Sequence, residues 1–227
     1  MSSVTTTSAT AGKRTPLSRR RILDAALEYI DTHGADALSM HKLGAELGVR
    51  GMSLYYYVAS KDDLLDGVVE LLWSEAEGAA PVTDDWRDGF RLFAHALRDV
   101  VRRHPYAAPL MTSQQVMPVP ALRLVETHIT AAIQGGAPQA QAYALLRTIT
   151  SYALGSALAE VSWGIGGPGC APRVGDLLRP GVPDKLAGVA EVFCGQSDPD
   201  AQFELGLDLM LRGIENAQPG SSAETSQ

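Results

Sequence analysis

Apolar residues recur at helical spacing along most of the chain, and the alternation typical of β-strands is scarce. Within residues 38–61, Gly48 separates two short segments that each carry one apolar stripe, and it suits the left-handed residue that ends a helix. Gly44 allows two helices to approach closely. The segment therefore predicts a helix-turn-helix, whose second helix enters the major groove of DNA. The apolar pairs are Leu43 with Leu47 and Leu54 with Val58.

Helices are also predicted on both sides of this segment. Ser18 is placed to cap a first helix, which Gly34 ends. Ser60, with Asp63 three residues later, starts the helix that connects the helix-turn-helix to the rest of the chain. Residues 106–120 contain three prolines and are expected to form only a turn or two of helix. The predicted helices span 19–32, 61–77, 86–104, 121–134, 138–163, 184–195 and 199–214.

This pattern predicts an all-α protein that is divided into four parts. We expect a disordered arm over 1–17, a three-helix DNA-binding domain over 18–63, a helical body over 64–216 and a polar tail over 217–227. Residues 164–183, rich in glycine and proline, are expected to form a surface loop. The 227 residues are 45% hydrophobic, which is enough for a substantial core.

The net charge also differs between the predicted DNA-binding part and the rest of the chain. Residues 1–61 hold eight basic and five acidic side chains, a net charge of +3, although the whole chain carries −7. The remaining residues carry −10. A basic unit joined to an acidic body indicates a DNA-binding part attached to a part with another role. Arg19, Arg20 and Arg21 open the first helix, where they either face a phosphate backbone or form a solvated charge run.

Several classes of protein are disfavoured. No apolar run approaches the length of a membrane span and the N-terminus does not resemble a secretory signal, so we expect a cytoplasmic protein. Cys170 and Cys194 are isolated and predict no metal or redox site. The five histidines are scattered without a catalytic partner, so we do not expect an enzyme. A helical adaptor that binds another protein and has no small-molecule effector remains the alternative.

The stretch LGAELGVRGMSLYYYVASKDDLLD, within residues 20–66, resembles the TetR (tetracycline repressor) family of bacterial transcription regulators. Residues 152–160 (YALGSALAE) and 203–215 (FELGLDLMLRGIE) are similar to long helices of tetracycline-repressor ligand domains. The resemblance implies that the body binds a small-molecule effector and forms a homodimer, and that the dimer represses transcription from a palindromic double-stranded operator until the effector releases it. The same apolar helices also suit an internal core without dimerisation.

Carried over position by position, the resemblance implies a set of DNA-contacting residues. Tyrosine hydroxyls suit phosphates, tyrosine ring edges suit thymine methyl groups, and Lys61 suits a phosphate. Tyr57 is expected to be partly in the core. No arginine, asparagine or glutamine is expected on the reading face, so the operator is not predicted. The residues are Met40, His41, Gly51, Met52, Ser53, Tyr55, Tyr56, Tyr57 and Lys61.

The resemblance also implies an effector pocket. Tetracycline repressors hold a drug-bound magnesium ion with a histidine and a glutamate, and these positions match Met111 and Ala159 here. A thioether is a poor ligand for a hard cation, so we expect no metal and no cofactor. The lining instead suits a hydrophobic, oxygen-bearing molecule, although the same residues suit ordinary core packing. They are Phe93, Leu97, Met111, Gln114, Gln115, Leu124, Thr127 and His128.

Overall fold

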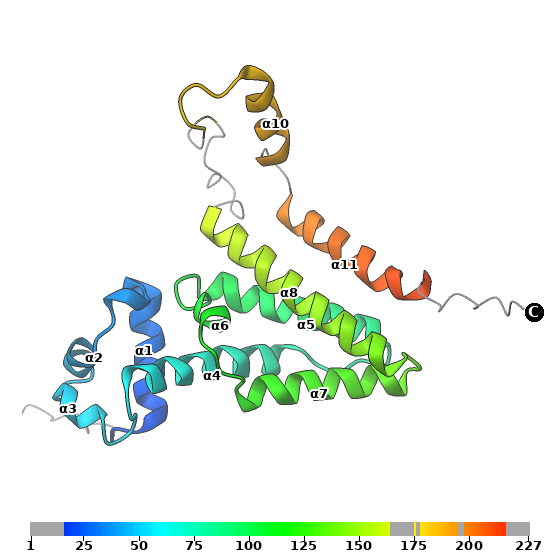
Figure 1. Cartoon of the computed structure of the whole chain (residues 1–227). Helices are drawn as coiled ribbons and strands as arrows, with labels where there is room; N and C mark the ends of the chain where they lie inside the picture. The colour runs from blue at the N-terminus through cyan, green and yellow to red at the C-terminus, as the bar shows by residue number, and fades with distance from the viewer. Residues whose placement is uncertain (1–15, 164–174, 176–177, 195–197, 217–227) are drawn as a thin grey trace, which may run out of the picture.

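The computed structural model of the protein describes residues 16–163, 175, 178–194 and 198–216. Every regular element in this part of the chain is a helix, which confirms the predicted all-α fold (Figure 1). No helix among these residues is long and apolar enough to cross a membrane. The helices are α1 (Arg19–His33), η1 (Ala35–Ala37), α2 (Met40–Glu46), α3 (Gly51–Leu54), α4 (Lys61–Ala79), α5 (Trp86–Arg103), α6 (Leu110–Ser113), α7 (Val119–Gln134), α8 (Gln139–Trp163), α10 (Asp184–Cys194) and α11 (Pro199–Asn216).

Residues 18–60, with α1, α2 and α3, form a small unit at one end of the molecule that we call the reader (Figure 1). Ser18 and Ser39 cap α1 and α2, and each hydroxyl accepts the backbone N–H three residues further on at 3.3 Å. Gly34 ends α1 and Gly48 follows α2, both with positive φ, as the sequence predicted. The reader's own core includes Ile22, Ala26, Ile30, Leu43, Leu54 and Val58.

Helix α4 carries the chain from the reader into the body. Ser60 starts it by accepting the N–H of Asp63 at 3.0 Å, which confirms the predicted cap. Leu64 is buried near its start and Leu72 beyond its middle. Since α4 packs on α1 and also on α5 and α7, the two parts of the protein share one apolar core.

The body, residues 61–216, is centred on α5. This helix packs on α4, α7 and α8, and its Phe90, Phe93 and Leu97 are fully buried. Helix α11 packs on α8, whereas α10 projects away from the rest of the body (Figure 1). The long apolar helices predicted from the sequence therefore surround α5.

A ladder of charges joins α5 to α11. Arg91 contacts Asp208 and Glu204, each at 2.6 Å, and His95 also contacts Glu204 at 2.5 Å. Further along, Arg98 and Arg102 share Asp200 at the start of α11. Arg91 and Arg102 hold the pKa of the aspartates they contact below the ordinary value, through hydrogen bonds to the ionised carboxylates. These pairs fix which face of α11 meets the body.

The ladder includes a buried ion pair. Arg98 and Glu160 are 2% and 8% exposed, and the guanidinium contacts the Glu160 carboxylate at 3.0 Å. The Arg98 guanidinium also lies 4.4 Å over the ring of Phe203 on α11. Removal of one partner would leave a buried charge, so this pair ties α5, α8 and α11 together.

Most helix bounds agree with the predicted ones to within a few residues, but α3 ends at Leu54, so the tyrosines and Val58, which were expected on the second helix of the helix-turn-helix, follow it in a turn. Helix α7 begins at Val119, two residues before the predicted start, because Pro120 tolerates the first turn, where no backbone N–H is needed. Residues 1–15 of the predicted arm over 1–17, residues 164–174 and 176–177 of the predicted loop over 164–183, the tail over 217–227 and Cys170 lie outside the described residues. The boundary between residues 63 and 64 stays a prediction.

Candidate DNA-binding and effector sites

Two glycines set the geometry of the helix-turn-helix. A Cβ atom on Gly44 would lie 2.7 Å from the backbone nitrogen of Gly51, and a Cβ on Gly51 would lie 2.8 Å from the carbonyl oxygen of Met40. Helix α3 therefore starts in backbone contact with α2, as predicted for Gly44. The close approach brings the exposed faces of the two helices together.

All three tyrosines that follow α3 are on the surface. Tyr56 is 90% exposed, whereas Tyr55 and Tyr57 are 44% and 39% exposed. Tyr57 is the least exposed of the three, which agrees with the prediction that it is partly buried. Met52 on α3 is 75% exposed beside them. Single exposed side chains of this kind are common on proteins, but a cluster of them marks a contact surface.

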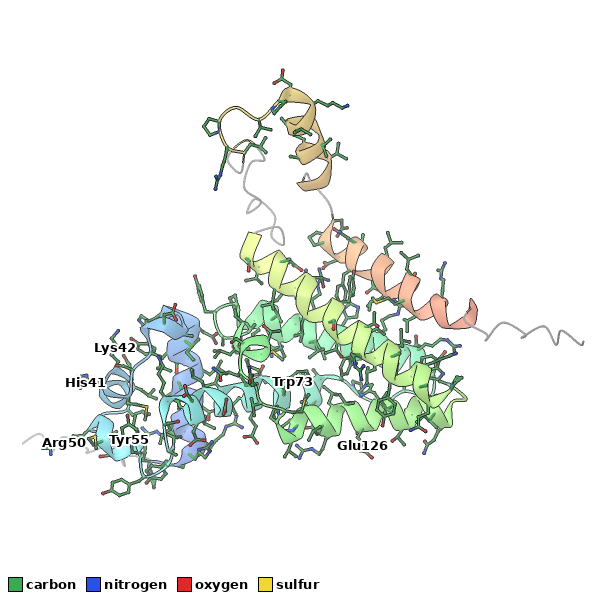
Figure 2. The ribbon with its side chains drawn as sticks, viewed as in Figure 1. His41, Lys42, Arg50, Tyr55, Trp73 and Glu126 are labelled. Atoms are coloured by element: carbon green, nitrogen blue, oxygen red, sulfur yellow. The ribbon has the colours of Figure 1, made fainter. Side chains whose placement is uncertain are left out.

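An open groove of about 570 Å³ runs between α2 and α3. Figure 2 shows His41 and Lys42 on α2 and Arg50 and Tyr55 at the ends of α3, all at the end of the molecule away from α8 and α11. The groove has a mainly apolar floor with basic and aromatic side chains at its edges. Its lining residues are Met40, His41, Ala45, Val49, Arg50, Gly51, Met52 and Tyr55.

Two of the predicted contact residues have different positions from those expected. Met40 is only 9% exposed, because its side chain joins the reader's core and reaches just the floor of the groove. The backbone of Gly51 packs against α2, although this residue was expected to contact DNA. His41 is exposed, whereas Ser53 and Lys61 are half-buried.

Arg19 has a structural role that the sequence left open. Its guanidinium donates to both carboxylate oxygens of Asp63, at 2.9 and 3.2 Å, and to the carbonyl oxygen of Tyr57 at 3.1 Å. Asp63 also accepts the N–H of Ala59 at 2.7 Å. Because Arg19 holds the pKa of Asp63 below its ordinary value, the carboxylate stays ionised and ties α1 to the segment that follows the tyrosines.

Sequence reasoning missed two basic residues of this surface. Lys42 and Arg50 are exposed, and Arg50 lines the groove, where no arginine was predicted. The indication in the sequence was their position, one directly after His41 and one directly before α3. Arg50 lies in the groove with Tyr55, whereas the Lys42 ammonium donates to the carbonyl oxygen of Ala37 at 2.9 Å, and both cations suit a phosphate backbone.

The predicted effector residues divide into two groups. Phe93, Leu97, Met111, Leu124 and His128 are buried in the body, and Gln114 is half-buried. Gln115 and Thr127 have exposed side chains. Thr127 precedes His128 by one residue on α7, and successive helical side chains differ by about 100°, so the two point to different sides.

His128 is the buried polar group of this set. It is 2% exposed, and its ring lies 5.3 Å from that of Phe93, centroid to centroid, in an edge-on arrangement. Nδ1 lies 2.9 Å from the carbonyl oxygen of Leu124, whereas buried Nε2 has no hydrogen-bond partner. Burial lowers the pKa of the imidazole, so the ring is held in its neutral form.

The expectation of no metal stays a prediction for the described part of the chain. Groups of three or more histidine, cysteine or carboxylate side chains at ligand distances are absent from it. Met111 is buried among apolar residues on α6.

The comparisons with known proteins agree on one family. Residues 22–68 match the bacterial regulatory proteins of the tetR family, and residues 79–218 match the tetracyclin repressor-like C-terminal domain. An HTH-type transcriptional regulator from Saccharopolyspora erythraea is 29% identical over 199 residues, which are 87% of this chain and 84% of the relative.

Solved structures show the same likeness. A possible TetR family transcriptional regulator from Streptomyces coelicolor A3(2) has a TM-score of 0.74 and 27% identity, over 88% of this chain and all of its own. The TetR family protein ActR of Streptomyces coelicolor, in complex with actinorhodin, has a TM-score of 0.72 and 26% identity, over 89% of this chain and 98% of its own. With its helix-turn-helix, its helical body and both domain matches, the chain belongs to the TetR family of DNA-binding transcription regulators.

Proposed function

We propose that this protein is a homodimeric repressor that binds a palindromic operator in the cytoplasm and is released from it by a small hydrophobic effector. The observation that carries the proposal is the exposed cluster of Met52, Tyr55, Tyr56 and Tyr57 beside the α2–α3 groove. An all-apolar cluster would suit a protein partner, whereas phenolic hydroxyls next to basic side chains suit phosphates and base edges.

In this proposal the residues around the groove divide the contacts with DNA. Arg50, which lines the groove, binds a phosphate or a base acceptor, and Lys42, exposed on α2, binds a phosphate. Met52 and the tyrosine rings provide the apolar surface that thymine methyl groups prefer, and the tyrosine hydroxyls bind phosphates. Arg19 contributes indirectly, because it holds the backbone at Tyr57 through its bond to the carbonyl oxygen.

The dimer would form through α8 and α11. Leu205 and Leu209, one turn apart on α11, are 60% and 65% exposed, although Phe203 and Leu207 on the opposite face of α11 are buried in the body. On α8 the small residues Ser151, Gly155 and Ala159 are exposed at four-residue spacing, which permits close helix packing. A two-fold axis through these helices would place two readers on two operator half-sites.

The effector would bind in the core of the body near Phe93 and His128. ActR has been crystallised with actinorhodin, so a protein of similar fold binds a small molecule. The predicted pocket residues that are buried here are apolar apart from His128, which favours a hydrophobic effector with few polar groups. The effector would release the operator by binding more tightly to the body of the DNA-free state.

Selection of bound fragments from random duplex DNA, with the purified full-length protein, tests the proposal. We expect a palindrome whose affinity falls by at least about a thousandfold between about 50 and 200 mM salt, since a dimer neutralises several phosphates. Light scattering should give twice the monomer mass, and Leu205→Glu with Leu209→Glu should give a monomer. If no sequence is enriched, or if binding ignores salt, the protein does not act as an operator-binding repressor.

A further inference from the structure

The core of the body contains one imidazole nitrogen whose bonding capacity is unused. His128 Nε2 is buried and has no hydrogen-bond partner, although nearly all buried polar side-chain atoms in proteins have one. The residue lies on α7, and its ring faces Phe93 of α5. An unsatisfied polar atom in such a place needs an explanation, and binding of a ligand is one.

The hydrogen bond at the other nitrogen fixes what Nε2 can do. The Leu124 carbonyl oxygen, 2.9 Å from Nδ1, can only accept, so Nδ1 carries the proton. A neutral imidazole has one N–H and one lone pair, and the lone pair therefore lies on Nε2. His128 consequently presents an acceptor to the core of the body, and only a donor can satisfy it.

None of the residues that the structure describes supplies that donor. The hydroxyl of Thr83 borders the same space at Gly89 as the ring, but it donates to the carbonyl oxygen of Asp85 at 2.6 Å. Gly89 leaves space beside the ring, since a Cβ built on it would lie 3.8 Å from His128 Cδ2 and 3.4 Å from Thr83 Oγ1. The missing side chain at Gly89 thus leaves room for a methyl group beside Cδ2, the ring carbon bonded to Nε2.

We propose that the effector carries a hydroxyl or N–H group that donates to His128 Nε2, as a phenol does, and that ethers and ketones of the same shape bind more weakly. The inference rests on the proposed effector site in the body, and it names the chemical group that the site selects. A ligand without a donor leaves the nitrogen unsatisfied, so we expect a phenol to bind about tenfold more tightly than its methyl ether.

Nitrogen-15 spectra of histidine-labelled, full-length protein test the premise without any ligand. The His128 resonances are identified by their loss in His128→Asn, which keeps an N–H for the Leu124 carbonyl and lacks Nε2. We expect a neutral ring with the proton on Nδ1. A ring protonated on Nε2, or on both nitrogens at neutral pH, overturns the inference.

The selectivity is tested with 2-naphthol and 2-methoxynaphthalene as probes. Titration with 2-naphthol should move the Nε2 resonance. The Kd of 2-naphthol should be about tenfold lower than that of 2-methoxynaphthalene. His128→Asn should remove most of this difference. Equal affinities, a preference that persists in the variant, or the failure of both probes to bind near His128 would each count against the inference.

A second variant keeps the histidine. Gly89→Ala fills the space beside the ring and leaves the bond to Leu124 intact, so it should weaken naphthol binding without a change in the Nδ1 resonance. If naphthol binds Gly89→Ala as it binds the wild type, the proposed contact does not form. Operator binding by the same preparations shows whether the repressor proposal holds when the donor requirement fails.

Discussion

His104 at the end of α5 donates through Nδ1 to the Asp31 carboxylate of α1 across 2.6 Å, and so joins the body to the reader. The other nitrogen of the ring contacts Glu75 of α4 at 3.1 Å. Asp31 Oδ1 is buried without a partner, so this carboxylate depends on the histidine. The contact lies where an effector-induced movement of the body would reach the reader.

Replacement of His104 by alanine should therefore loosen the reader from the body. We expect a loss of about 1–3 kcal/mol in the free energy of unfolding, because the half-buried Asp31 carboxylate would lose its partner. The three tryptophans, Trp73, Trp86 and Trp163, all belong to the body, so tryptophan fluorescence reports the body and circular dichroism reports the whole protein. In the variant the dichroism should change at a lower temperature than the fluorescence.

The control for this experiment is His33→Ala, since His33 is an exposed histidine of α1. Its effect should stay within about 0.5 kcal/mol, as for most surface substitutions. Coincident melting curves in His104→Ala, with stability unchanged, would show that the bridge does not couple the two parts.

A matched pair of glycines tests the packing of the helix-turn-helix. Gly44→Ala forces a methyl group to within 2.7 Å of the Gly51 nitrogen, and should destabilise the protein by about 1–3 kcal/mol and abolish operator binding. Gly78→Ala, in α4 with nothing near its Cβ, should stabilise by about 0.5–1 kcal/mol. Urea unfolding measures both. Equal effects of the two substitutions would mean that the close approach is not required.

The tyrosine surface is tested by Tyr56→Ala. Because this side chain is 90% exposed, its removal should leave the unfolding midpoint unchanged. It should nevertheless raise the operator Kd by about tenfold or more, as the loss of a base or phosphate contact does. Tyr106→Ala, which removes a tyrosine 59% exposed between α5 and α6, is the control and should not change the Kd. A normal Kd for Tyr56→Ala would place the DNA surface elsewhere.

The parts of this structure that were predictable have local causes. Gly48 and Gly34 end helices through their own backbone conformation, and Ser18 and Ser60 cap helices through bonds to residues three positions away. The helix-turn-helix and the exposed tyrosines therefore followed from short stretches of sequence.

The parts that were missed join distant segments. Arg19 meets Asp63 across 44 positions, and His104 meets Asp31 across 73. Periodicity places each of these residues on a helix face but does not say which other helix lies opposite. The same reason explains why the exposure of the Thr127 side chain and the burial of Met40 were not predicted.

The burial of His128 predicts a pH dependence of stability. Its pKa is lowered from the ordinary value of 6.5 in the folded protein, so between the two values the unfolded chain binds more protons than the folded one. The contribution of His128 to stability is thus complete above about pH 6.5 and decreases as the pH falls, by up to about 1.4 kcal/mol per pH unit, until the folded pKa is reached.

The comparison of the wild type with His128→Asn isolates this contribution, because the other titrating groups are common to both proteins. Urea unfolding between about pH 7.5 and pH 5.5 should show the wild type losing more stability than the variant. A ligand that donates to Nε2 competes with the proton for the same lone pair, so effector affinity should fall over the range in which the folded histidine becomes protonated. Parallel stability curves for the two proteins would mean that His128 remains accessible to protons, and that its nitrogen is not the isolated acceptor inferred above.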